Sequence, residues 1–201
     1  MPAKTEELQR WLVTDGEEFL RAVGLRPGCA VLDFGCRRGT YAIPAARLVG
    51  SRGVVHAVDK DRQALDELAQ LATTEGLTNI HHIDTQGRVT VPLEDESIDV
   101  VLLYDVIHLM GWVNGEGESV RRSTAADRGP LVQEMHRVVR PGGLLSLYSP
   151  HLSTHTDLKS EAELWAEIEG YRFRFVNELY RDLIHDDQLA RGHIVNFARQ
   201  P

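Results

Sequence analysis

The chain has 201 residues, of which 42% are hydrophobic and 26% charged, and its formal net charge is −8 at pH 7. A chain of this length buries about 70% of its unfolded surface, enough for a full core without disulfide or metal support. Because phosphate neutralisation dominates nucleic-acid binding, an acidic chain without a basic block argues against a nucleic-acid partner. No apolar run reaches the roughly 18–20 residues of a membrane span, so no membrane partner is expected either.

The cysteines and the N-terminal residues indicate the cellular compartment of the protein. Two cysteines, Cys29 and Cys36, are too few for a disulfide framework. The first residues are charged and lack the apolar stretch of a secretory signal. We therefore expect a cytoplasmic protein, and a single domain over residues 1–201, because no linker or repeat divides the chain.

The N-terminal segment, residues 1–24, is predicted to be a helical prelude. Apolar side chains recur at helical spacing from Leu8 to Val23. Thr14 and Glu17 have the spacing of a capping box, which predicts a second helix starting there.

From residue 30 onward, short and nearly continuous apolar runs alternate with segments of helical period. Such runs are typical of strands covered on both faces, as in a parallel sheet. The predicted strands are residues 30–34, 54–58, 79–84, 98–104 and 143–149, and the predicted helices are 40–49, 61–76 and 130–141. This alternation predicts right-handed crossovers and an α/β fold with a doubly wound, mostly parallel, Rossmann-like sheet.

Two regions depart from this alternation. Residues 111–127 are rich in Gly and Ser without apolar periodicity, which predicts a mobile loop or lid. Residues 172–176 and 192–199 alternate partially and are separated by the polar stretch 180–191, which predicts an antiparallel terminal pair. Residues 183–187 are expected to be a solvated turn, with a place over an acceptor pocket as the alternative.

The loop after the first predicted strand carries the main functional signal. Gly35 and Gly39 allow a tight bend, and Asp33 ends the strand. Asp59, 24 residues after Gly35, ends the second strand, where a carboxylate can receive both hydroxyls of a ribose. In open parallel sheets ligands bind beyond such strand ends. These residues together predict a nucleoside-binding crevice.

The same loop does not match the phosphate-binding pattern G-x-G-x-x-G, because Cys36, Arg37 and Arg38 stand between its glycines. An aspartate two positions before the first glycine also repels a phosphate. A nucleoside carrying an amino-acid tail is therefore expected rather than a dinucleotide.

Five motifs occur in order along the chain. They are the strand and loop from Val31 to Gly39, Asp59, Asp84, the segment from Pro92 to Val101, and the segment from Val132 to Gly143. In this order they resemble the class I S-adenosylmethionine-dependent methyltransferases, especially their small-molecule, type 11-like branch, over about residues 28–199. The resemblance implies a seven-stranded sheet with an antiparallel C-terminal strand.

The resemblance also implies S-adenosylmethionine as cofactor and assigns residues to it. The implied cofactor-binding residues are Asp33, Gly35, Cys36, Gly39, Asp59, Lys60, Asp84, Thr85 and Tyr104. Cys36 is expected to contribute only its backbone. The family's middle glycine is Arg37 here. We expect this side chain to point away from the cofactor or to pair with its carboxylate, unless it is simply a solvated cation.

Methyl transfer from a sulfonium is an in-line displacement that proximity and alignment can carry, so a dedicated catalytic residue is optional. His108 is the candidate general base, with a packed structural histidine as the alternative. Asp105 is expected to cap the following turn. His151 and His155 have a spacing that can hold a metal, but no acidic or cysteine partner stands at ligand spacing, so no metal site is expected.

The leading interpretation is therefore an S-adenosylmethionine-dependent methyltransferase that acts on a small-molecule acceptor as a monomer or homodimer. One alternative is a non-catalytic protein of the same fold that binds or regulates, which the substitution at Arg37 suggests. Another is a nicotinamide-dependent oxidoreductase on a similar sheet.

Overall fold

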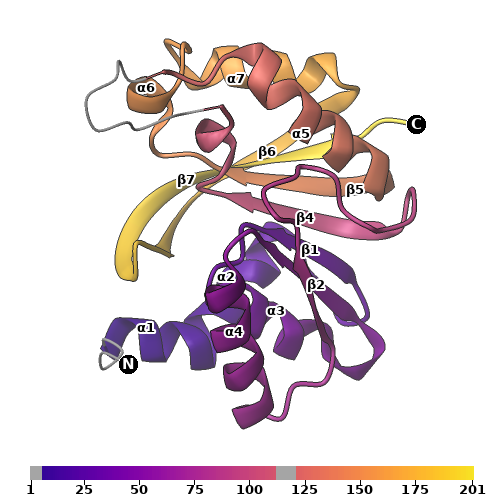
Figure 1. Cartoon of the computed structure of the whole chain (residues 1–201), viewed down its shortest axis with the longest axis vertical. Coiled ribbons are helices and arrows are strands. Elements are labelled where there is room, and N and C mark those ends of the chain that lie inside the picture. The colour runs from indigo at the N-terminus through magenta and orange to yellow at the C-terminus, as the bar shows by residue number, and fades with distance from the viewer. Residues whose placement is uncertain (1–5, 112–120) are drawn as a thin grey trace.

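The computed structural model describes residues 6–111 and 121–201 and contains one β-sheet. Its strands are β1 (Ala30–Phe34), β2 (Val54–Asp59), β3 (Ile80–Asp84), β4 (Ile98–Tyr104), β5 (Val139–Tyr148), β6 (Phe173–His185) and β7 (Gln188–Arg199). They form one seven-stranded sheet in the order β3-β2-β1-β4-β5-β7-β6 (Figure 1). The first five strands pair in parallel, and β7 pairs antiparallel with β5 and with β6. The predicted doubly wound sheet with an antiparallel C-terminal strand is confirmed.

Helices cover both faces of this sheet. They are α1 (Glu6–Arg10), the π-helical turn η1 (Trp11–Asp15), α2 (Gly16–Val23), α3 (Ala42–Val49), α4 (Arg62–Thr74), α5 (Ala125–Val138), α6 (Leu152–His155) and α7 (Glu161–Gly170), with short 3₁₀ turns η2 (Gly50–Arg52) and η3 (Ile107–Leu109). In Figure 1, α2, α3 and α4 lie below the central strands, and α5 and α7 lie above them. Among the described helices, none is long and apolar enough to cross a membrane.

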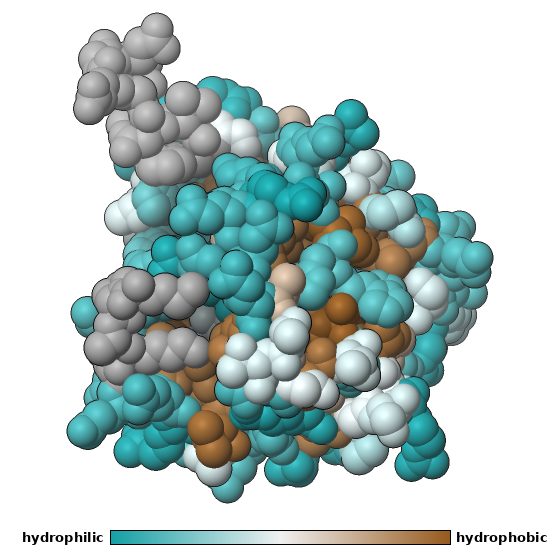
Figure 2. Space-filling model, turned by 60° about the horizontal axis from the view of Figure 1, so that its bottom comes forward, coloured by the Kyte–Doolittle hydropathy of each residue, from teal (hydrophilic) through white to brown (hydrophobic). Residues whose placement is uncertain are grey.

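Two hydrophobic clusters explain why the strands are apolar throughout. Leu102 on β4 packs with helices α2 to α4 on one face, and its neighbour Leu103 packs with α5 and α7 on the other. Both side chains are 0% exposed. Since successive side chains of a strand point to opposite faces, a sheet covered on both sides needs apolar residues at every position. On the face drawn in Figure 2, hydrophilic side chains predominate and hydrophobic ones show as patches between them.

Residues 6–23 are helical as expected, and residues 1–5 lie outside the described residues. The predicted capping box at Thr14 is wrong. Thr14 Oγ1 donates to the carbonyl of Arg10 within a continuous helix. Asp15 keeps helical angles (φ −63°, ψ −34°). Because the π-helical turn carries the chain through residues 11–15, no new helix start is present to be capped.

The predicted loop 111–127 is wrong in its second part, while residues 112–120 lie outside the described residues. Helix α5 begins at Ala125, before the predicted start at Pro130, and a capping box between Thr124 and Asp127 fixes that end. Ser123 forms a bridge to Thr156. The sequence gives no apolar signal here because hydrogen bonds, rather than burial of an apolar face, order residues 121–127.

The predicted antiparallel terminal pair is confirmed, but the prediction that the polar stretch 180–191 separates its two strands is wrong. Tyr180 pairs with His193, and the ladder continues to His185 and Gln188 at the tip of a long β6–β7 hairpin. β6 is the last strand of the sheet, and most of it is exposed. A strand with so little burial carries no hydrophobic alternation, so its length cannot be read from hydropathy.

Candidate functional site

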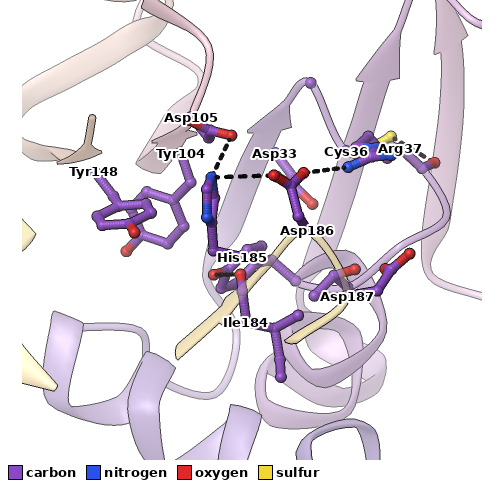
Figure 3. Close-up of a pocket in the computed structure, with 13 residues that line it drawn as sticks. Asp33, Cys36, Arg37, Tyr104, Asp105, Tyr148, Ile184, His185, Asp186 and Asp187 are labelled. Atoms are coloured by element: carbon purple, nitrogen blue, oxygen red, sulfur yellow. Dashed lines mark hydrogen bonds and ion pairs between the residues drawn. The ribbon is translucent and has the colours of Figure 1, made fainter. Parts of the chain in front are cut away.

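A narrow pocket lies at the carboxyl ends of β1, β4 and β5, with a cavity volume of about 50 Å³ (Figure 3). Strand order reverses between β1 and β4, and this is where ligands bind in doubly wound sheets. β6 runs parallel to β5 through their shared partner β7, so the hairpin tip reaches the same edge. His185, Asp186 and Asp187 of that tip line the pocket. The expected solvated turn is confirmed only at Asp186 and Asp187, which are exposed between β6 and β7, because Leu183 and Ile184 are buried residues of β6. A place over an acceptor pocket stays a prediction.

The structure brings together some of the predicted cofactor residues. Asp33, Gly35, Cys36 and Tyr104 line the pocket. Gly39, Asp59, Lys60, Asp84 and Thr85 are outside its lining. Asp59 and Asp84 nevertheless lie side by side, because their strands β2 and β3 end in register. The backbone N–H of Thr85 donates to the carbonyl of Asp59 at 3.0 Å. The predicted nucleoside residues thus form a group next to the pocket.

Two glycines shape the loop for different reasons. Gly35 has φ +84°, and a Cβ there would lie 2.4 Å from Val106 Cγ2. This glycine lets the loop turn against the segment after β4 at the pocket wall. Gly39 has φ +91°, and a Cβ there would lie 2.3 Å from Leu68 Cδ1 of α4. Gly39 therefore serves helix packing, and its predicted contact with the cofactor stays a prediction.

Arg37 adopts the left-handed backbone conformation, with φ +47°. This conformation suits glycine and is strained for arginine. Its side chain is 66% exposed, and its guanidinium lies 3.4 Å from the Asp186 carboxylate of the hairpin tip. Arg37 thus lines the pocket, with its guanidinium directed to Asp186 of the hairpin tip (Figure 3).

Asp33 is a buried carboxyl group with an open hydrogen-bonding position. The residue is 3% exposed, and its Oδ2 is buried with no hydrogen-bond partner. Burial, reinforced by the charge of Asp59, raises the pKa of Asp33 to about 7. A buried carboxylate without a partner is costly, so this position favours a bound cationic group.

Aromatic side chains form the wall behind Asp33. Tyr41 and Tyr104 meet edge to face with ring centres 4.8 Å apart. The Tyr104 hydroxyl is 2.8 Å from Ser146 Oγ, and the Tyr41 hydroxyl donates to the Ile184 carbonyl at 2.7 Å. Since both hydroxyls are engaged, these rings serve as a fixed apolar wall. Cys36 is also passive, because burial raises the pKa of its thiol far above neutral.

His108 is placed poorly for the role of general base. The residue is 1% exposed and is not part of the pocket lining. Burial and the neighbouring histidines lower its pKa to about 3. A base with so low a pKa is badly matched to neutral pH. The geometry supports the alternative of a packed histidine, behind the wall of the site.

A group of polar residues at the strand ends was missed by sequence reasoning. His185 Nε2 lies 2.9 Å from Asp105 Oδ2 and 3.2 Å from His151 Nε2. Asp105 does not cap the following turn, since η3 has no side-chain cap. No acidic partner of His151 stands at ligand spacing in the sequence, but the fold brings Asp105 Oδ1 to 3.9 Å from its Nε2. The partners come from three distant segments, so local spacing could not reveal them; only the shared edge of parallel strands predicts such a meeting.

Comparisons with known proteins agree with this architecture. Residues 32–147 match the family described as "Methyltransferase domain". Aklanonic acid methyltransferase DauC of Streptomyces sp. (strain C5) is 34% identical over 136 residues, which cover 63% of this chain and 60% of that protein. Demethylmenaquinone methyltransferase of Geobacillus kaustophilus is 28% identical over 168 residues, 84% of this chain and 62% of that protein. The chain thus spans about three-fifths of the length of these two relatives.

One solved structure illustrates the likeness in fold. A SAM-dependent methyltransferase from Aquifex aeolicus superposes with a TM-score of 0.67 at 20% identity, covering 94% of this chain and 92% of that one. At this identity the likeness concerns the fold alone.

Proposed function

The chain belongs to the class I S-adenosylmethionine-dependent methyltransferases, and from this premise we propose that it transfers a methyl group from S-adenosylmethionine to a small-molecule acceptor. The observation that carries the proposal is the buried, unpartnered Oδ2 of Asp33 beside the Gly35 bend. A polar atom in this state at the switch point of the sheet favours a cationic ligand group. The methionyl ammonium of the cofactor is such a group.

The residues present fit the cofactor in their chemistry. Asp33 would bind the ammonium, and the Gly35 backbone would approach the methionyl part without a side chain in between. Asp59 would accept hydrogen bonds from the ribose hydroxyls, with Asp84 and Thr85 at the adenine edge. Asp59 and Asp84 are paired in register at the ends of β2 and β3. Lys60, next to Asp59, is exposed and would lie at the rim of the same site.

The pocket must widen to admit this ligand. Its volume of about 50 Å³ is small, whereas ligand pockets usually measure roughly 300–1,000 Å³. The hairpin tip narrows it through His185, Asp186 and Asp187. The tip is held to the loop after β1 by the exposed ion pair of Arg37 and Asp186, and such pairs contribute little. We therefore infer that Asp186 and Asp187 shift when the cofactor binds, while Ile184 and His185 keep their contacts with Tyr41 and Asp105.

When bound, the sulfonium supplies an activated methyl carbon. The chain's own contribution is then alignment and exclusion of water, for which the rigid wall of Tyr41 and Tyr104 and the hairpin tip are suited. Among the described residues that line the pocket, the groups able to accept a proton are His185 and the carboxylates of Asp33, Asp105, Asp186 and Asp187, whereas His108 lies outside the lining. Because alignment can carry this displacement without a dedicated base, the proposed transfer rests on positioning.

A small-molecule acceptor is supported by the relatives. The printed names of two of them give aklanonic acid and demethylmenaquinone as what they methylate. The acidic net charge of −8 also disfavours a nucleic-acid acceptor. A cytoplasmic location, a monomeric or homodimeric state and a single domain stay predictions from the sequence.

The test combines binding and turnover on the full chain. We expect S-adenosylmethionine and its demethylated product to bind in calorimetry, and a panel of small phenols, carboxylic acids and quinols to yield methylated product. Binding without turnover across the panel would favour the non-catalytic alternative. A melting temperature raised by NAD but not by S-adenosylmethionine would favour the oxidoreductase, since a ligand stabilises the native state that binds it.

A further inference from the structure

Three potential metal ligands meet at the carboxyl edge of the sheet, on three different segments. Asp105 directly follows β4, His151 follows β5, and His185 ends β6. One ligand atom from each residue lies within 4.8 Å of the other two. The meeting follows from topology, because parallel strands end at the same edge and the β6–β7 hairpin returns to it.

Two of the separations match those between ligands of one ion. His185 Nε2 is 2.9 Å from Asp105 Oδ2 and 3.2 Å from His151 Nε2. Ligand bonds of about 2.0–2.1 Å place neighbouring ligand atoms roughly 2.9 Å apart in an octahedron and roughly 3.3 Å apart in a tetrahedron. These two separations fall at the expected values, whereas His151 Nε2 lies 3.9 Å from Asp105 Oδ1. Binding one ion therefore requires these two side chains to adjust toward a common centre, while His185 already lies at ligand spacing from both.

The protein holds these groups at a cost that hydrogen bonding does not offset. Asp105 has the left-handed φ of +59°, and its Oδ1 is buried without a hydrogen-bond partner. His185 Nε2 faces both Asp105 Oδ2 and His151 Nε2. This nitrogen carries at most one proton, and a single N–H cannot point along both contacts. Backbone strain of this kind clusters at functional sites. A cation satisfies the carboxylate and both nitrogens together.

We propose that Asp105, His151 and His185 bind one divalent transition-metal ion of the Zn²⁺ and Fe²⁺ type. Two imidazoles and one carboxylate suit these ions, whereas Mg²⁺ prefers oxygen ligands. His108 supports the site from behind: its Nε2 is 3.6 Å from Asp105 Oδ1, and its ring stacks on His155 with centres 5.0 Å apart. Such neighbours orient metal ligands.

The ion would lie in the wall of the cofactor pocket. Asp105 and His185 line that pocket. Three protein ligands leave at least one coordination position open, which can hold an oxygen of a small molecule and favour its deprotonated form. This role toward the acceptor rests on the proposed methyl transfer, while the metal site itself does not.

The test uses the full chain stripped with a chelator. Calorimetry with Zn²⁺ is expected to show one ion per chain, Co²⁺ is expected to give the visible absorption of a low-symmetry site, and Mg²⁺ is expected not to bind. Asp105→Asn, His151→Gln and His185→Gln should each weaken Zn²⁺ binding by about 100-fold, since the loss of a supporting partner alone costs 10–100-fold. His82→Gln, at an exposed histidine of β3, is the matched control and should bind as the wild type does.

Each outcome decides for or against the site. Equal Zn²⁺ affinity of the wild type and His151→Gln, or loss of affinity in His82→Gln to the same extent, would overturn the proposal. Melting curves identify a variant that fails to fold, and Asp105→Asn keeps a residue that tolerates the left-handed conformation. S-adenosylmethionine binding by the stripped protein is measured in parallel. Failure of Zn²⁺ binding alone removes the metal site, and failure of cofactor binding alone removes the proposed function.

Discussion

The backbone N–H of Arg37 donates a 2.8 Å hydrogen bond to Oδ2 of Asp59, which lies 22 positions later in the chain. The other oxygen of that carboxylate accepts from the backbone N–H of Asp61 at 2.9 Å. A single carboxylate thus joins the loop after β1 to the start of α4. Each carboxylate oxygen has a further lone pair, so Asp59 can keep these bonds and still receive ribose hydroxyls.

Asp59→Asn should weaken the binding of S-adenosylmethionine by about 10–100-fold, because a hydrogen bond to a charged group contributes roughly 1.5–3 kcal/mol. The amide keeps the size of the carboxylate but loses its charge and one acceptor. Calorimetry on the full chain measures the effect. Asp66→Asn is the matched control, because Asp66 is an exposed carboxylate of α4 paired with Arg62. Wild-type affinity in Asp59→Asn would remove Asp59 from the ribose site.

Arg37→Gly should raise both stability and cofactor affinity. Glycine takes φ +47° without the strain of a side chain, a difference of roughly 1 kcal/mol. The lost ion pair to Asp186 is exposed and spans 3.4 Å, so its removal costs little and frees the hairpin tip. Thermal unfolding and calorimetry measure the two effects. Arg38→Gly, at a position without positive φ, should instead lower stability. A lower melting temperature for Arg37→Gly would contradict this account.

Asp33→Asn should change how stability depends on pH. The pKa of Asp33 is raised to about 7 in the folded protein from an ordinary 3.8, so the native state binds more protons than the unfolded state between these values. The ligand-free wild type should therefore lose stability as pH rises through this range. Urea unfolding at several pH values should show a flatter profile for Asp33→Asn and greater stability than wild type above about pH 7.

Asp33→Asn should weaken cofactor binding, although it should stabilise the ligand-free protein above about pH 7. An ionised Asp33 attracts the methionyl ammonium, so wild-type affinity should rise with pH through about 7. Asp33→Asn should bind more weakly at every pH and without this rise. A variant with unchanged affinity and an unchanged pH profile would show that the carboxylate faces no cation.

The central sheet can be predicted from the sequence because its strands are buried on both faces, and each therefore consists of a nearly continuous run of apolar residues. The run at β4 is one example, where Leu102 and Leu103 enter opposite clusters. The segment from Val132 to Gly143, which resembles a family motif, contributes a structural contact. Glu134 Oε1 accepts from the Val91 N–H at 2.8 Å and pairs with Arg137, which fixes the loop before β4 to α5. A resemblance to family motifs thus predicts the fold more directly than it predicts the residues that take part in the reaction.

Fewer residues of the site can be predicted from the sequence, because several of them are far apart along the chain and are brought together only by the order of the strands in the sheet. Asp33 and Gly35 are adjacent in sequence and are found by their loop. His185 reaches Asp105 across 80 positions through an exposed hairpin that has no hydropathy signal. His108 sits near the site in sequence, but its burial and low pKa follow from packing that no local pattern contains.

Arg128 offers a test of how the segment before α5 is ordered. The residue is 0% exposed, and its guanidinium binds Glu167 at 2.6 Å, Asp157 at 3.0 Å and the Ser123 carbonyl at 2.8 Å. The Arg128 guanidinium therefore links α5 to α7 through Glu167. It also links α5 to Ser123 and Asp157, which precede α5 and α7. Arg128 is buried, but the side chains of Asp157 and Glu167 are 50% and 24% exposed, so water can solvate them when the cation is removed. The expected cost is therefore that of lost hydrogen bonds to a charged group, about 1.5–3 kcal/mol.

Arg128→Ala should accordingly lower the free energy of unfolding by about 1.5–3 kcal/mol in urea titrations. The free energy of unfolding of Arg128→Lys should lie between those of the wild type and Arg128→Ala, because an ammonium cannot form the bidentate contact with Glu167. Arg62→Ala removes an exposed pair and should cost less than about 1 kcal/mol. If Arg128→Ala unfolds at the wild-type urea concentration, the buried network contributes nothing, and packing of α5 alone orders residues 121–127.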